Sequence, residues 1–211
     1  MNNFLTLLVN EIVGSLFKDA PEIDDLGDIF IGSNRDDNLK GGDNDDIFLA
    51  KGGDDTVKGG GGTDYVFAGS GNDLVIGQTG DDVAILGSGD DRFIWNNGDG
   101  SDLINGGAGF DTTQVNGADE AGDEFELRQA GGRTLFSRLN LGQFTLTNRQ
   151  IEQFEINGQG GDDSLTVGNL SRKVQKVDFS GDDGNDTLDA KASSPTIEAY
   201  GGDGDELLLV G

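Results

Sequence analysis

The chain has 211 residues, of which 34% are hydrophobic and 37 are glycine, and 40 acidic residues against 14 basic ones give a net charge of -26. This charge argues against nucleic acid and anionic membranes as partners, because both are themselves negatively charged. The chain contains no histidine and no cysteine, which excludes disulfide bonds and the usual ligands of zinc, copper and iron and leaves oxygen-bound cations such as calcium as the favoured partners.

The N-terminal segment, residues 1–22, is predicted to form a short amphipathic helix. Phe4, Leu8, Ile12 and Leu16 follow the spacing of one helical face. The segment has no early positive charge and no small-residue cleavage site, so we do not expect a Sec signal peptide. It is also too short and too polar to span a bilayer, and we therefore expect a helical cap and no membrane span.

A period of nine residues begins at Gly32 and continues to Gln114. Each unit follows the pattern GGxGxDxUx, in which x is any residue and U is apolar, as in AGSGNDLVI from Ala68 and LGSGDDRFI from Leu86. Glycines allow a turn to adopt positive φ and to point its carbonyl groups inward, and the aspartate adds a charged oxygen. Each turn therefore offers part of the oxygen shell of a calcium ion.

The aspartates at the sixth position of the pattern are predicted to stack on two edges of a coiled structure. If two units form one coil, stacked aspartates lie 18 residues apart, and the inserted residues Trp95 and Asn96, interpreted as a widened corner, lengthen this spacing to 20 on both edges. Calcium takes roughly six to eight oxygens, more than one turn offers, so we expect ions between successive turns. The candidate calcium ligands are Asp28, Asp46, Asp64, Asp82 and Asp102 on one edge and Asp37, Asp55, Asp73, Asp91 and Asp111 on the other.

The strands between the turns are predicted to have one inward and one outward face, because alternate residues of a strand point to opposite sides. The interior positions are Leu39, Phe48, Val57, Val66, Val75, Ala84, Phe93 and Ile104. One outer face begins with the polar residues Asn38, Lys40, Thr56 and Lys58, and the other carries Ile47, Leu49, Tyr65, Phe67, Val83 and Ile85. An exposed apolar array of this size is unusual, so we expect the N-terminal helix or a second subunit to cover it.

The pattern is lost between residues 115 and 157 and returns in a longer form. The sequence FELRQAGGRTLFSRL is typical of two strands around the turn at Gly131 and Gly132, a hairpin excursion for which no metal site is predicted. Turns of the calcium type return with Asp163 and Asp186 as further candidate ligands and with Glu206 in the same position. Plain glycine turns without ions are the alternative for this second half.

Apolar residues around these later turns predict a wider coil with aligned columns. Three columns are expected, and they contain Phe154, Val177 and Ile197; Ile156, Phe179 and Ala199; and Leu165, Leu188 and Leu208. Such columns are typical of a parallel β-helix, in which equivalent strands of successive coils pair with one another.

The nonapeptide pattern resembles the RTX, or haemolysin-type, calcium-binding repeats of secreted bacterial proteins. The resemblance covers residues 32–114 and implies a right-handed parallel β-roll with two nonapeptides per coil and calcium between successive turns. It also implies export by type I secretion without an N-terminal signal, and therefore an extracellular or cell-surface location. The expected fold is all-β, with a helix over residues 1–22, a β-roll over 23–117, and a hairpin followed by a wider β-helix, together a solenoid, over 118–211.

The favoured function is that of a secreted structural protein, not an enzyme, that is disordered without calcium and folds as it binds the ion. Low hydrophobicity with high net charge is typical of disorder, so binding energy would supply folding energy. Leu207, Leu208 and Leu209 in the last strand further suggest head-to-tail self-association into filaments, a matrix or a surface layer. The alternative is a calcium-binding accessory module, or a polysaccharide-binding one, of a secreted enzyme or toxin.

Overall fold

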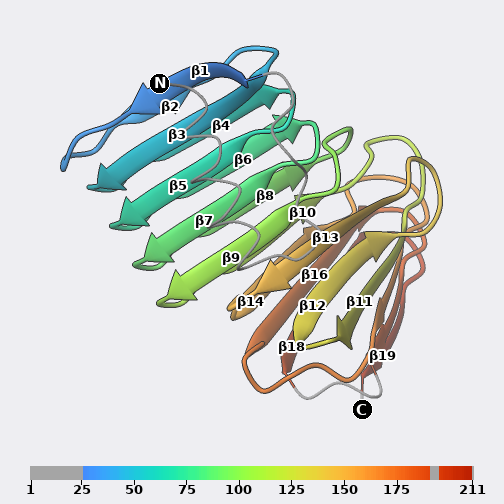
Figure 1. The fold of residues 1–211 in the computed structure, drawn as a ribbon. Coiled ribbons are helices and arrows are strands. Elements are labelled where there is room, and N and C mark those ends of the chain that lie inside the picture. The colour runs from blue at the N-terminus through green and yellow to red at the C-terminus, as the bar shows by residue number, and fades with distance from the viewer. Residues whose placement is uncertain (1–25, 191–194, 211) are drawn as a thin grey trace.

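The computed structural model describes residues 26–190 and 195–210, and every helix or strand in these ranges is a β-strand. The strands form a parallel β-solenoid of about nine turns, in which successive coils stack along one axis from β1 to β19 (Figure 1). The all-β solenoid predicted from the repeats is thus confirmed. The helix predicted for residues 1–22 lies outside the described residues.

Two sheets form the walls of the solenoid. Sheet A contains, in spatial order, β1 (Leu26–Ile31), β3 (Asp45–Gly52), β5 (Tyr65–Ser70), β7 (Val83–Ser88), β9 (Leu103–Ala108), β13 (Phe144–Arg149), β12 (Arg133–Arg138), β11 (Glu124–Ala130), β15 (Ser164–Val167), β17 (Thr187–Ala190) and β19 (Leu207–Val210). Sheet B contains β2 (Asn38–Lys40), β4 (Thr56–Gly61), β6 (Leu74–Thr79), β8 (Arg92–Asn96), β10 (Thr112–Asn116), β14 (Gln153–Asn157), β16 (Lys176–Asp183) and β18 (Thr196–Asp203).

The register of the first coils follows the spacing of the repeats. Ile47 lies beside Tyr65, 18 residues later, and after the two-residue insertion Val83 lies beside Leu103, 20 residues later. The shift to 20 occurs in both sheets, as expected, because β8 and β10 pair with the same offset. The predicted pairing of two units per coil is therefore confirmed.

The inserted residues lie in a strand and not in a corner, which corrects the interpretation of Trp95 and Asn96. Both belong to β8, and the chain turns only after Asn96. The Trp95 side chain is fully buried, stacks on Phe144 with ring centroids 3.7 Å apart, and donates its indole N–H to the carbonyl oxygen of Gly100 at 2.9 Å. The strand itself has only five residues, so the insertion lengthens the coil and places a large aromatic ring in the core.

The interior is a thin continuous core between the two sheets. All eight residues predicted for the interior of the roll either belong to this core or, in the case of Leu39, pack against it while partly buried. The three columns predicted in the second half are also present, since Phe154, Val177 and Ile197 lie side by side, as do the members of the other two columns. Apolar residues therefore follow the predicted columns in register, and they are buried except in the last coil, where Ile197 and Ala199 are partly buried and Leu208 is exposed.

The outer faces of the two sheets differ as predicted. On sheet B, Asn38, Lys40 and Lys58 are exposed. On sheet A, Ile47, Tyr65 and Val83 point away from the core yet are at most 1% exposed, and they form a second apolar cluster with partly buried neighbours. The helix predicted to cover this face lies outside the described residues, and its cover by that helix or by a second subunit stays a prediction.

The predicted hairpin is present, but it is part of sheet A and not an excursion from it. Strand β12 runs antiparallel to both β11 and β13 (Figure 1), and the three strands lie between β9 and β15, so β9 pairs with β13. Phe125, Phe136 and Phe144 from these strands are buried in the common core. Because these rings extend the core of the solenoid, the three strands take the place of a single strand in the wall.

Candidate calcium sites

The turns of the repeats depend on glycine at positions where a side chain would not fit. In the turn before β5, Gly60 and Gly62 have φ of 121° and 96°, a conformation that residues with a Cβ rarely adopt. A Cβ built on Gly59 would lie 2.2 Å from Oδ2 of Asp64 and 2.5 Å from the carbonyl oxygen of Gly77 in the next coil. The glycines therefore allow carboxylate and carbonyl oxygens from two coils to approach one another closely.

The sixth-position aspartates form two ladders of hydrogen bonds, one at the start of each sheet's strands. The backbone N–H of each aspartate donates to Oδ1 of the aspartate one coil later, with N···O distances of 2.6–3.0 Å. The sheet A ladder contains Asp28, Asp46, Asp64, Asp82 and Asp102 and continues beyond the hairpin with Asp123, Asp163 and Asp186. The sheet B ladder contains Asp37, Asp55, Asp73, Asp91 and Asp111.

The second carboxylate oxygen of most ladder aspartates is buried and has no hydrogen-bond partner. This is true of Oδ2 in Asp55, Asp64, Asp73, Asp82, Asp91, Asp102, Asp111, Asp163 and Asp186. An unsatisfied buried polar group costs roughly 1–3 kcal/mol, and a charged one costs more. Rows of unpaired carboxylate oxygens beside glycine turns are the donor set that a hard cation such as calcium takes, so these residues fit the ion.

The first members of the ladders differ from the others. The Asp28 side chain is exposed, and this residue joins the ladder through its backbone N–H. Oδ2 of Asp37 accepts hydrogen bonds from the N–H of Ser33 at 2.6 Å and from its hydroxyl group at 2.9 Å. Oδ2 of Asp46 accepts a hydrogen bond from the N–H of Gly42 at 2.9 Å. The carboxylates of Asp37 and Asp46 therefore already accept hydrogen bonds from the protein at Oδ2, which the sequence pattern does not reveal.

Burial and mutual repulsion raise the pKa of several ladder carboxyls in the middle of the roll. Burial is the main cause for Asp64, whose pKa rises to about 7, and for Asp82, whose pKa rises to about 9 with a further contribution from the charge of Asp102. The pKa values of Asp73, Asp91 and Asp111 rise to about 6 for the same reason. Without a cation, burial therefore disfavours the charged form of these five carboxyls relative to an exposed aspartate.

Backbone carbonyl groups would have to supply much of the coordination. Among residues 26–190 and 195–210, no three acidic side chains converge on one point as a metal cluster would require. Calcium accepts backbone carbonyl oxygens as readily as carboxylates. The candidate sites would therefore be distributed along the turns, with the carboxylates of the ladders as their charged members.

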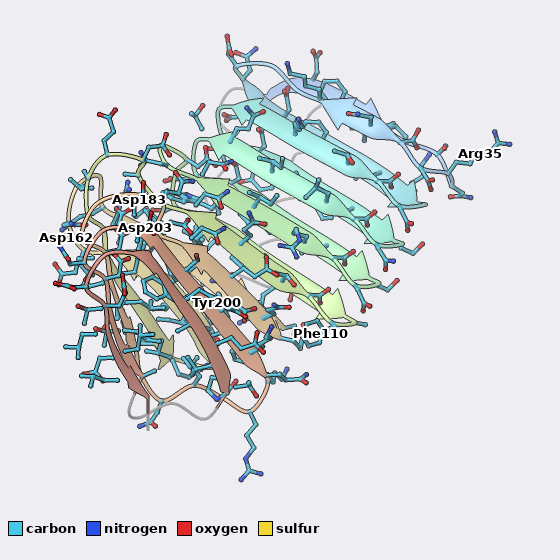
Figure 2. All side chains as sticks on the ribbon, turned by 180° about the vertical axis from the view of Figure 1, so that it is seen from behind. Arg35, Phe110, Asp162, Asp183, Tyr200 and Asp203 are labelled. Atoms are coloured by element: carbon cyan, nitrogen blue, oxygen red, sulfur yellow. The ribbon has the colours of Figure 1, made fainter. Side chains whose placement is uncertain are left out.

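An outer ladder, which the sequence interpretation missed, runs beside the first two. The residue at the fifth position, usually aspartate, accepts the N–H of the equivalent residue in a neighbouring coil, as in the 2.8 Å bond from Asn72 to Oδ1 of Asp54. Most of these side chains are exposed, and in the second half Asp162 lies near the acidic residues Asp183 and Asp203 of adjacent turns (Figure 2). The repeated Asp-Asp pairs of the sequence are the signal that would have revealed this ladder.

Two further acidic residues were missed because they lie outside the regular repeats. Asp123 is buried at the start of β11, and its N–H donates to Oδ1 of Asp163 at 2.6 Å. Glu152 extends the sheet B ladder, since its Oε2 accepts the N–H of Asp111 at 3.0 Å. In the next coil Gln175 replaces the acid, and its N–H donates to the carbonyl oxygen of Glu152. In the last coils the ladder carboxylates therefore lie on the sheet A edge and not on the sheet B edge. Glu206 belongs to the sheet A edge, and its Oε1 is buried without a hydrogen-bond partner.

The fold and its turns define a calcium-binding β-solenoid. The family model described as RTX calcium-binding nonapeptide repeat matches the chain in four copies, at residues 24–57, 58–93, 97–112 and 179–197. The chain is therefore an RTX calcium-binding nonapeptide-repeat protein, as its resemblance predicted, and the matched residues make up about half of its length. The comparison with curated proteins gave no match. Within the described ranges, no helix has the length and apolar character needed to cross a membrane.

Proposed function

We propose that this protein is a non-catalytic structural protein of the cell exterior that folds as calcium binds to its ladders. The observation that carries this proposal is the row of buried Oδ2 atoms without hydrogen-bond partners. Calcium at these oxygens would neutralise the repulsion between coils and join each turn to the next, so that binding energy becomes folding energy.

The proposed ligands are the ladder aspartates with unpaired oxygens, together with carbonyl groups of the glycine turns. Of the residues predicted from the sequence, nine belong to this set, namely Asp55, Asp64, Asp73, Asp82, Asp91, Asp102, Asp111, Asp163 and Asp186. Asp28, Asp37 and Asp46 are the weaker candidates, because the first is exposed and the other two already accept hydrogen bonds at Oδ2.

A calcium titration followed by circular dichroism tests this proposal. We expect a disordered spectrum in a chelator and a cooperative gain of β signal as calcium is added. Magnesium should act poorly, because it requires a smaller octahedral shell and gives up its water reluctantly. A β spectrum that a chelator leaves unchanged would contradict calcium-driven folding.

An extracellular location follows from the same chemistry. A chain of this charge that needs calcium would remain unfolded where the ion is scarce and would fold after export. Type I secretion, which is typical of RTX proteins, suits a chain that crosses the envelope unfolded. Expression with and without a type I transporter tests this location, and retention inside the cell in both cases would count against it.

Self-association along the solenoid axis is the second part of the proposal. Among the described strands, β1 and β19 are the edges of sheet A, where backbone groups are available for pairing, and on β19 Leu207 and Leu208 are 52% and 39% exposed. Contact between two different ends of the molecule does not close on itself and therefore produces filaments. Electron microscopy with calcium should show linear polymers that L208K abolishes, whereas dispersed monomers of the unchanged protein in calcium would refute this part.

A further inference from the structure

The sheet A ladder is interrupted at the hairpin, and an arginine lies at the interruption. Between the strands that begin after Asp102 and Asp123, sheet A contains β13 and β12. Because β12 runs antiparallel, it presents its C-terminal residue, Arg138, at the edge where the parallel strands present their aspartates; Arg138 lies opposite Phe125 of β11. A positive side chain thus occupies this edge between two ladder carboxylates.

The guanidinium of Arg138 is surrounded by oxygen atoms. Its Nη1 donates to Oδ1 of Asn97 at 2.8 Å and to Oδ1 of Asp123 at 3.2 Å, and its Nε donates to the carbonyl oxygen of Gly142 at 2.9 Å. The side chain of Arg138 is only 5% exposed and that of Asp123 is fully buried. A carboxylate, an amide oxygen and a backbone carbonyl are also the three kinds of protein ligand that calcium takes.

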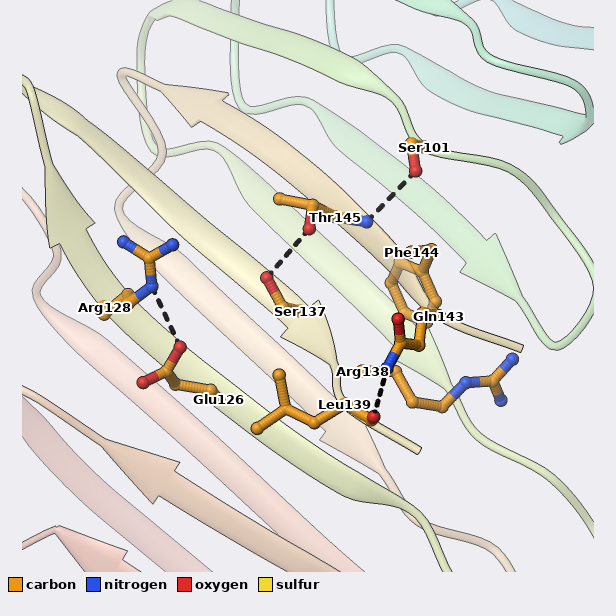
Figure 3. Close-up of a pocket in the computed structure, with 9 residues that line it drawn as sticks. All are labelled: Ser101, Glu126, Arg128, Ser137, Arg138, Leu139, Gln143, Phe144 and Thr145. Carbon is orange, nitrogen blue, oxygen red and sulfur yellow. Dashed lines mark hydrogen bonds and ion pairs between the residues drawn. The ribbon is translucent and has the colours of Figure 1, made fainter. Parts of the chain in front are cut away.

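Aromatic rings complete the environment of this cation. The guanidinium carbon lies 5.4 Å from the centre of the Trp95 ring and 5.2 Å from that of Phe144, distances at which a cation is attracted by the ring face. Figure 3 shows Arg138 beside Phe144, with its guanidinium directed away from Arg128 and Glu126 on the outer face. The surroundings therefore favour a permanent, weakly hydrated cation such as arginine.

Asp123 differs from its neighbours in the ladder in the way its oxygens are used. Its Oδ2 accepts the N–H of Ala118 at 2.8 Å, and its Oδ1 accepts Arg138. By contrast, Oδ2 of Asp102 and Oδ2 of Asp163, on either side, are buried without partners. Asp123 is thus a ladder carboxylate whose charge is already compensated by the protein.

We propose that Arg138 takes the place of a calcium ion at the hairpin, so that this coil is held together by a cation of the chain itself. The inference rests on the proposed function, because it assumes that the neighbouring carboxylates hold calcium. It implies that the junction between the roll and the later coils requires no calcium ion of its own. It also implies that removing the guanidinium exposes a latent calcium site at Asp123, Asn97 and the carbonyl of Gly142.

The first test compares D123N with D163N in the full chain. Both substitutions keep an Oδ1 acceptor for the ladder and remove one negative charge. We expect the number of calcium ions bound at saturation, measured by equilibrium dialysis, to be unchanged in D123N and to fall in D163N. Loss of a bound ion in D123N would overturn the inference. If D163N also binds as many ions as the unchanged protein, the proposed function itself is in doubt, so the two failures can be distinguished.

The second test uses Trp95, the only tryptophan of the chain, as a local probe. Terbium replaces calcium at oxygen sites, and a nearby tryptophan sensitises its emission. R138Q should gain one bound terbium ion and a rise in tryptophan-sensitised emission, whereas R138K, which keeps a positive charge, should gain neither. R92Q is the matched control, because it removes an arginine that pairs with Glu155 on the outer face of sheet B. No gain in a folded R138Q would overturn the inference, and if R138Q does not fold, the D123N comparison decides.

Discussion

The two oxygens of a ladder aspartate have separate functions. In Asp82, Oδ1 accepts the N–H of Asp64 at 2.8 Å, whereas Oδ2 is buried without a partner. The adjacent residue, Asp81, is exposed, and its Oδ1 accepts the N–H of Ser101 at 2.8 Å in the outer ladder. Two neighbouring residues of the same type are therefore expected to respond very differently to the loss of charge.

We predict that D82N weakens calcium binding strongly and that D81N does so only slightly. Asparagine retains the Oδ1 acceptor in both positions, so the ladders remain, but at position 82 it removes the charge that faces the proposed ion. Half-maximal folding of D82N should require roughly tenfold more calcium, a change of about 1.4 kcal/mol. Calcium titrations followed by circular dichroism measure both shifts, and an equal shift in the two variants would contradict the assignment of ligands.

The sequence predicts individual residues well only where they repeat. The sixth-position aspartates are found by their period, and all of them lie on the ladders. Asp123 and Arg138 occur once, at a place where the pattern is lost, so no spacing marks them. Their pairing depends on the reversal of β12, which only the strand order reveals.

At the scale of a single element, each turn is determined by its glycines. Gly62 has φ of 96°, and a Cβ there would lie 2.6 Å from the backbone carbonyl carbon of Asn44 in the preceding coil. A Cβ at Gly42, by contrast, would have no neighbour within 4 Å. We therefore expect a side chain to be excluded at Gly62, where it would meet the preceding coil, and to be tolerated at Gly42, where it would not.

We predict that G62A is strongly destabilising and that G42A is close to neutral. Left-handed φ costs a residue with a side chain about 1–2 kcal/mol, and the contact with the preceding coil adds to this cost. G62A should therefore lose about 2 kcal/mol or more of unfolding free energy, measured by urea denaturation in saturating calcium. Similar losses in G62A and G42A would show that the close contact between coils is unimportant.

The hairpin shows how far an element can be predicted from sequence. The pair Gly131 and Gly132 between two alternating patterns is sufficient to predict β11, β12 and their antiparallel pairing. The position of these strands inside sheet A is not predictable in the same way, because local alternation does not specify which distant strand becomes the neighbour. That choice follows from the burial of Phe125, Phe136 and Phe144 in the common core.

At the scale of the whole molecule, the ladders couple folding to pH. Burial raises the pKa of Asp64 to about 7 and that of Asp82 to about 9 in the folded state, above the value of about 3.9 in an unfolded chain. A folded chain without metal therefore binds more protons than an unfolded one across this range. The contribution of these carboxyls to the unfolding free energy of the metal-free chain is fully present below about pH 4, and it is lost as the pH rises through about 6 to 9.

We predict opposite effects of pH with and without calcium. In a chelator, the β signal measured by circular dichroism should be strongest at acid pH and should fall toward neutral pH. With calcium present, the affinity should increase with pH, because protons and the ion compete for the same oxygens. A β signal in chelator that increased from pH 4 to pH 8 would contradict the raised pKa values.

The alternation of the two ladders also restricts how such a chain can change in length. Removal of 18 residues takes out one strand of each sheet and would bring Asp46 against Asp82 and Asp55 against Asp91 with both ladders in register. Removal of nine would transfer every later strand to the opposite wall, so that polar outer residues would meet the buried face around Tyr65. Gain or loss of a single repeat is therefore disfavoured, and we expect repeats in proteins of this design to be gained or lost in pairs.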